Sequence, residues 1–85
     1  MTRGDLLKRI TFNPKIYGGK AIIRGHRLAV QHVLEMLAAG DTAERLVTEY
    51  EWLEPEDVQA CLLYAARMVG NERIAPVLTS EAADR

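Results

Sequence analysis

Cysteine and histidine are scarce in this chain: Cys61 is the only thiol, and there are two histidines among 85 residues. An internal disulfide needs two thiols, and a structural zinc site needs several cysteines or histidines at short spacing, so both kinds of staple are excluded. We therefore expect a single domain, residues 1–85, without a metal or cofactor. A domain this short hides only about 60% of the surface of its unfolded chain, so a partner that adds burial would stabilise it.

Long apolar runs are missing as well. No segment approaches the roughly 18 apolar residues that a membrane span needs, and no charged-then-apolar leader opens the chain. The sequence thus predicts no contact with a membrane, and we expect the protein in the cytoplasm.

Charge is distributed unevenly along the chain. Residues 1–28 hold seven cationic side chains against Asp5 alone, a net charge of +6, whereas residues 29–85 carry −7. An anionic polymer would be attracted to the first segment and repelled by the second. The split predicts different partners for the two segments; the alternative is that they neutralise each other when the chain folds.

The basic segment is also expected to contain a β-hairpin. Its short apolar bursts alternate with turn residues, namely Asn13-Pro14, Gly18-Gly19 and Gly25. Glycine takes positive φ without steric cost, so Gly18-Gly19 is expected to form a tight turn between Ile16-Tyr17 and residues 21–23.

Beyond Leu28 the apolar period becomes that of a helix. Apolar residues at i, i+3, i+4, i+7 and i+8 predict a first helix that ends at Gly40, and they are Val30, Val33, Leu34, Leu37 and Ala38. Asp41 stands three residues before Glu44, the spacing of a capping box, and an apolar stripe to Tyr50 follows. This pattern predicts a short second helix.

A third helix is expected to begin at Pro55, which two acids follow, and to end near Val69. The three helices make a core over residues 29–70, and residues 71–85 form a tail. Two short helices joined by a turn, after a further helix, are typical of helix-turn-helix proteins. The expected fold is mainly α, with a homeodomain-like three-helix helix-turn-helix core and a small N-terminal β-hairpin.

The third helix is a poor candidate for entering a DNA groove, because Glu56 and Asp57 would face the phosphates. The basic hairpin is the better candidate, since a two-stranded ribbon from each subunit of a dimer fits a groove. The expected DNA-contacting residues are Lys15, Lys20, Arg24 and Arg27. A solvated hairpin edge, where lysines discourage strand pairing, is the alternative.

The third helix carries more apolar residues than one buried face uses. The expected inward stripe is Val58, Cys61, Leu62, Ala65 and Met68 or Val69. Because large apolar patches seldom persist on monomers, the remaining surface predicts a homodimer or a protein partner. The expected contact residues are Trp52, Leu63, Tyr64, Ala66 and Arg67. Alternatively, the hairpin or the tail covers this helix, and Trp52 fills a gap in the core.

Catalytic patterns are incomplete, so we expect no enzyme. Gly18-Gly19-Lys20 lacks the spacer and the hydroxyl residue of a phosphate-binding loop, and His26 and His32 have no third metal ligand. Cys61 on an inward stripe is expected to act as a small hydrophobe. The rival hypothesis is a small hydrolase that uses the acids near Trp52 with a histidine.

Several short motifs follow one another in an order typical of one bacterial family. They are Asn13-Pro14, residues 18–30, residues 37–40, Tyr50, Leu53 and residues 55–58. Through them the chain from Ile10 to about Arg67 resembles the domain-of-unknown-function 433 family. Members look like antitoxins of type II toxin–antitoxin pairs with a homeodomain-like fold. The resemblance implies a protein that neutralises a PIN-like ribonuclease toxin and represses its own operon as a dimer; the alternative is a stand-alone helix-turn-helix regulator.

The chain departs from the family pattern at three positions. His26 replaces a threonine, Glu51 stands where a proline normally follows the tyrosine, and Glu54 replaces a threonine cap before Pro55. Because threonine caps a helix better than glutamate, the third helix is expected to start less well than in other members.

Overall fold

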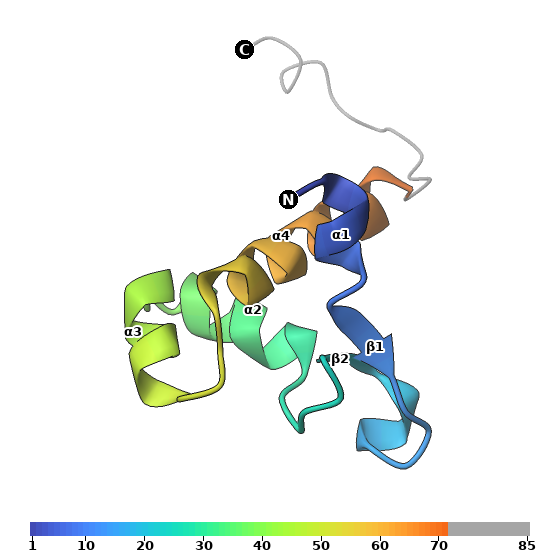
Figure 1. Ribbon diagram of the computed structural model, residues 1–85, viewed down its shortest axis with the longest axis horizontal. Coiled ribbons are helices and arrows are strands. Elements are labelled where there is room, and N and C mark those ends of the chain that lie inside the picture. The colour runs from blue at the N-terminus through green and yellow to red at the C-terminus, as the bar shows by residue number, and fades with distance from the viewer. Residues whose placement is uncertain (72–85) are drawn as a thin grey trace, which may run out of the picture.

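The computed structural model describes residues 1–71 as four helices and a two-stranded sheet (Figure 1). In chain order the elements are α1 (Arg3–Leu7), β1 (Ile10–Phe12), the 3₁₀ helix η1 (Tyr17–Gly19), β2 (Ala21–Ile23), α2 (Val30–Ala38), α3 (Ala43–Glu49) and α4 (Pro55–Gly70). The mainly helical fold with a small antiparallel sheet is confirmed. The predicted tail lies outside the described residues from residue 72 onward.

The hairpin is present, but its predicted tight turn is wrong. Strands β1 and β2 pair antiparallel with Ile10 opposite Ile23, so the loop between them spans residues 13–20 and not two glycines. The Asn13 side chain accepts a hydrogen bond from the Lys15 amide (2.8 Å), which turns the chain at the start of the loop. Ile16 is buried in this loop, so burial of its side chain explains why the chain leaves the sheet early.

The first two predicted helices match α2 and α3 closely. Gly40 ends the first at φ 108°, a conformation that favours glycine. The predicted cap of the second is wrong by one residue: the Thr42 hydroxyl, and not Asp41, accepts a hydrogen bond from the Arg45 amide (3.1 Å). Both residue types cap helices, so the spacing alone did not separate them.

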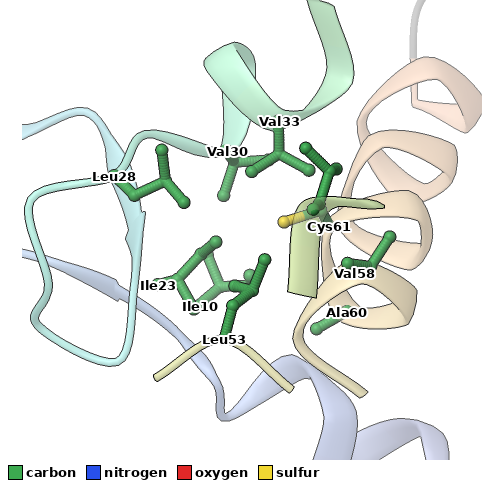
Figure 2. Close-up of a cluster of buried hydrophobic side chains, with 10 residues drawn as sticks. Ile10, Ile23, Leu28, Val30, Val33, Leu53, Val58, Ala60 and Cys61 are labelled. Carbon is green, nitrogen blue, oxygen red and sulfur yellow. The ribbon is translucent and has the colours of Figure 1, made fainter. Parts of the chain in front are cut away.

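A single apolar core joins the sheet to helices α2, α3 and α4 (Figure 2). Its buried members are Ile10, Ile23, Leu28, Val30, Val33, Leu46, Leu53, Val58, Ala60 and Cys61. The members on α4 all belong to the first half of that helix. This half is therefore fixed to the body of the protein, whereas the second half extends along its edge (Figure 1).

Helix α1 was not predicted. Its start is a capping box, in which the Asp5 amide donates to the Thr2 hydroxyl (3.0 Å) and the Thr2 amide donates to the Asp5 carboxylate (3.3 Å). The Thr-x-x-Asp spacing is the signal that sequence reasoning overlooked. The helix lies against α4 and adds Leu6 to the edge of the core, so part of α4 is covered by the N-terminus (Figure 1).

Cys61 lies in the core with no exposed surface, as its expected role as a small hydrophobe requires. Burial raises the pKa of its thiol to about 12, with a smaller contribution from the Asp57 charge. Because only the thiolate is nucleophilic, we expect alkylation of the native protein at pH 8 to be about a thousandfold slower than alkylation of the unfolded chain. Mass spectrometry after iodoacetamide treatment, with and without denaturant, measures the ratio; equal rates would contradict this placement.

None of the helices in residues 1–71 combines the length and the hydrophobicity that crossing a bilayer requires.

Candidate functional site

A buried carboxylate joins the start of α4 to the basic N-terminal segment. Asp57, in the first turn of α4, has no exposed surface. Its Oδ1 accepts hydrogen bonds from Arg24 Nε and Arg9 Nη1, and its Oδ2 accepts one from Arg24 Nη2, all at 2.9 Å. Oδ2 also accepts the Glu54 amide (2.8 Å), so the same carboxylate caps the helix.

The ionisation of Asp57 is set by two opposing effects. Burial raises the pKa of the carboxyl group, because a charge is poorly solvated in the interior. Hydrogen bonds from Arg24, the Glu54 amide and Arg9 lower it by more, so the pKa of Asp57 lies below its ordinary value. The carboxylate is therefore charged at neutral pH and fully hydrogen-bonded, which is the condition for a buried ion pair to be stable.

Arg24 is held by three groups of the acidic segment. Besides the two bonds to Asp57, its Nη2 donates to the Trp52 carbonyl (2.8 Å), and its guanidinium lies 5.7 Å from the centre of the Trp52 ring. Its φ of 44° is unusual for a residue other than glycine, and these bonds stabilise that conformation. Arg9 and Arg24 of the basic segment are thus neutralised by Asp57 of the acidic segment.

Trp52 is partly buried and forms a stacked pair with His26. The two rings lie 3.8 Å apart at an angle of 3°. Trp52 stands before the start of α4, so it is separated from the other expected contact residues, which lie in the second half of that helix. Trp52 therefore packs at the edge of the core, where it contacts the His26 ring and lies near the Arg24 guanidinium.

The other three predicted DNA-contacting residues are exposed. Lys15 and Lys20 lie in the hairpin loop, and Arg27 lies in the loop after β2. The Tyr17 hydroxyl donates to the Arg27 carbonyl (3.2 Å), so the two loops are joined. Lys20 Nζ donates to Gln31 Oε1 (2.9 Å) at the start of α2. The three residues therefore lie on two loops that a hydrogen bond connects, and we call Lys15, Lys20 and Arg27 the basic surface.

The second half of α4 has a solvent-facing apolar stripe. Leu62 and Val69 are 50% and 66% exposed, and Ala66 between them is also exposed. Their spacing of i, i+4 and i+7 places them on one side of the helix. We call Leu62, Ala66 and Val69 the outer stripe. The prediction that Leu62 points inward is wrong. The buried face of α4 includes Asp57 and Ala60 on the side away from Leu62, so Leu62 lies outside that face.

The remaining expected contact residues do not share one face. Leu63 and Tyr64 are half-buried, whereas Ala66 and Arg67 are exposed. The Tyr64 ring lies 6.3 Å from the exposed ring of Phe12 on β1, so it belongs to the side of α4 that faces the sheet.

An apolar groove of about 340 Å³ lies between α4 and the body of the protein. The end of the hairpin loop, β2, α2 and the last turns of α4 line it, with the residues Lys20, Ala21, Val30, Gln31, Leu34, Tyr64, Ala65, Met68 and Val69. It continues the buried face of α4 beyond Cys61, where neighbouring elements no longer cover the helix.

The family model described as "Protein of unknown function (DUF433)" matches residues 10–65. The chain belongs to this family. The DUF433 segment runs from β1 to the middle of α4, and it contains the Asp57 network except Arg9. Helix α1 and the last turn of α4 lie outside it.

One relative is the "Uncharacterized protein y4eO" of Sinorhizobium fredii, strain NBRC 101917 / NGR234. It is 34% identical over 56 residues, which is 66% of this chain and 25% of the relative. The chain therefore spans about a quarter of the length of the curated relative that it matches. No solved structure matches the chain.

Within the part of the chain that the structure describes, no three histidine, cysteine or acidic side chains gather as metal ligands. In the DUF433 segment His26 is stacked on Trp52, and His32 lies apart on α2. Of the acids near Trp52, Asp57 is engaged by two arginines. Within residues 1–71 the charged groups that the structure brings together form ion pairs.

Proposed function

We propose that this DUF433 protein is an antitoxin-like binding protein, which neutralises a PIN-like ribonuclease toxin and binds operator DNA as a dimer. The observation that carries the proposal is the outer stripe on α4. The antitoxin role is inferred from the resemblance of residues 10–67 to DUF433 proteins that look like antitoxins. The outer stripe and the basic surface support a binding function.

The outer stripe suits the binding of a helix face in a partner's apolar groove. Leu62 and Val69 provide the large apolar side chains, and Ala66 between them allows close approach. The first half of α4 is fixed by the core and by Asp57, so the stripe is presented on a rigid helix. A preorganised helix loses little conformational entropy on binding, and this raises the affinity.

Co-expression with the product of the adjacent gene tests the toxin-binding part. We expect the two proteins to co-purify, and the ribonuclease activity of the partner to fall when this chain is present. A partner that elutes separately and keeps full ribonuclease activity would contradict the proposal.

DNA binding is assigned to the basic surface of Lys15, Lys20 and Arg27. Arg24 is omitted from the contact set because its guanidinium is engaged with Asp57 and Trp52. A dimer would offer two such surfaces, one to each half of an operator.

Salt dependence tests this assignment. We expect the variant Lys15→Ala/Lys20→Ala/Arg27→Ala to bind operator DNA more weakly, with the slope of log K against log salt reduced by about 3, because each lost phosphate contact removes about 0.9. The matched control, Arg3→Ala/Lys8→Ala/Arg45→Ala, removes the same charge from α1, its C-cap and α3, and should keep the native slope. Equal slopes in both variants would contradict the assignment. DNA binding without any toxin complex would favour the stand-alone regulator instead.

A further inference from the structure

The groove beside α4 borders the outer stripe and shares Val69 with it. Its apolar lining includes Ala21, Leu34, Ala65 and Met68, and its polar lining residues are Lys20 and Gln31. Met68 is 55% exposed, although it lies on the same side of α4 as Cys61, about two turns further along the helix. An exposed apolar surface that continues a core is a site for a further apolar segment.

The chain itself continues from the end of this groove. Helix α4 ends at Gly70, one residue after the groove residue Val69, and Asn71 follows as its C-cap. Fourteen further residues, 72–85, lie beyond the described structure. Four of the five residues 74–78 are aliphatic and the fifth is Pro76, whereas the residues after them are mainly polar or small.

We propose that residues 74–78 of the same chain occupy this groove. The short connection through residues 72–73 holds the apolar segment close to the groove, and a short tether gives an effective concentration in the millimolar range. At that effective concentration, even a weak apolar interaction between residues 74–78 and the groove is enough for the segment to bind there. Pro76 has no amide hydrogen and a fixed φ, so the segment loses little entropy and needs few hydrogen-bond partners.

The reach of the chain is sufficient. Along the helix axis Tyr64 lies about 10 Å from Asn71, at 1.5 Å per residue. Seven residues from Asn71 to Leu78 span up to about 23 Å when extended. A chain that reverses at Gly70 and Asn71 therefore passes the whole length of α4 that borders the groove.

Paramagnetic relaxation in the full-length chain tests the docking. A spin label is attached to the variant Ser80→Cys; Cys61 stays unlabelled because it is buried and its pKa is raised to about 12. We expect the label to broaden the methyl signals of Ala21 and Leu34, which line the groove on the body of the protein. The signals of Val47 on α3 serve as the internal reference.

Two variants separate docking from mere tethering. Ile74→Asp/Val77→Asp/Leu78→Asp should abolish the broadening, because aspartates do not enter an apolar groove. The control Thr79→Asp/Ala82→Asp/Ala83→Asp adds the same charge to the same segment outside the apolar run and should keep it. Broadening that is absent, or equal in both variants, would overturn the proposal.

A mixed sample shows whether the segment that occupies the groove belongs to the same chain or to a second copy. Spin-labelled chains without isotope are mixed with isotope-labelled chains that carry no spin label, and the expected result is no broadening. Broadening in this mixture would mean that a second copy fills the groove, and it would also overturn the proposal. The experiment needs neither toxin nor DNA, so its failure is distinguishable from failure of the proposed function.

Discussion

Replacing Arg24 with alanine is expected to lower the free energy of unfolding by about 3 kcal/mol, at the lower end of the range for breaking a buried ion pair. The variant removes two of the four hydrogen bonds to the Asp57 carboxylate, which has no exposed surface. Arg9 and the Glu54 amide remain, so the charge is only partly compensated. In a domain of this size the loss corresponds to a fall in the melting temperature of more than about 10 °C.

Arg27→Ala is the matched control, because it removes an exposed arginine three residues away. Its effect on stability should stay within about 0.5 kcal/mol. Urea denaturation followed by circular dichroism measures both variants. The conservative variant Arg24→Lys should recover only part of the loss, since lysine lacks the planar fork that bonds both carboxylate oxygens. Similar midpoints for the two alanine variants would show that the Asp57 network does not hold α4 in place.

Acid should destabilise the native protein through the same carboxylate. The pKa of Asp57 is lowered in the fold relative to the unfolded chain, so the unfolded state binds more protons at low pH. Its contribution to stability is present above the unfolded pKa of about 3.9, and it is lost as the pH falls through the folded pKa. We expect the free energy of unfolding to fall below about pH 5, and to fall less in Asp57→Asn. Identical pH dependence in both proteins would exclude this role.

Replacing Leu62 with aspartate is expected to weaken binding of the partner protein by about 100-fold. The change places a charge in the centre of an apolar contact, and central apolar residues of an interface contribute about 2 kcal/mol or more each. Leu62 is half-exposed in the free protein, so the stability of the chain itself should change little. Isothermal titration calorimetry with the co-purified partner measures the affinity.

Gln59→Asp provides the control for charge on α4. It adds the same negative charge on the same face of α4, one turn before Leu62, so it lies at the N-terminal edge of the outer stripe and not at its centre. We expect its affinity to be close to that of the native protein. Equal losses in both variants would point to general charge repulsion, and no loss in Leu62→Asp would remove the outer stripe from the interface.

The elements of the fold that depend on local signals could be predicted from the sequence. Apolar periodicity and Gly40 placed α2, and Pro55 with its following acids placed the start of α4. The hairpin turn could not be placed, because the glycines fit either a tight turn or the longer loop around Ile16. That choice is decided by burial of Ile16 against the rest of the protein, which no local pattern contains.

The binding surfaces were only partly predictable, for a related reason. The sequence indicates an excess of apolar residues on α4. Because apolar residues lie all round this helix, the pattern does not show which side is buried, and it does not reveal that Leu62 is half-exposed. The charge split suggested a basic surface, yet it could not show that Arg24 binds Asp57, 33 residues away. Glu54 was expected to cap α4 poorly; the Asp57 carboxylate supplies a bond to its amide, which the residue types alone did not reveal.

Hydrogen–deuterium exchange on the complex with the toxin tests the central claim most directly, because it reports where the partner contacts this chain. The account predicts slower exchange in the second half of α4, at residues 62–70, with little change in the hairpin loop at residues 13–20. Protection confined to the loop, with exchange in α4 unchanged, would contradict the assignment of the outer stripe as the protein-binding surface.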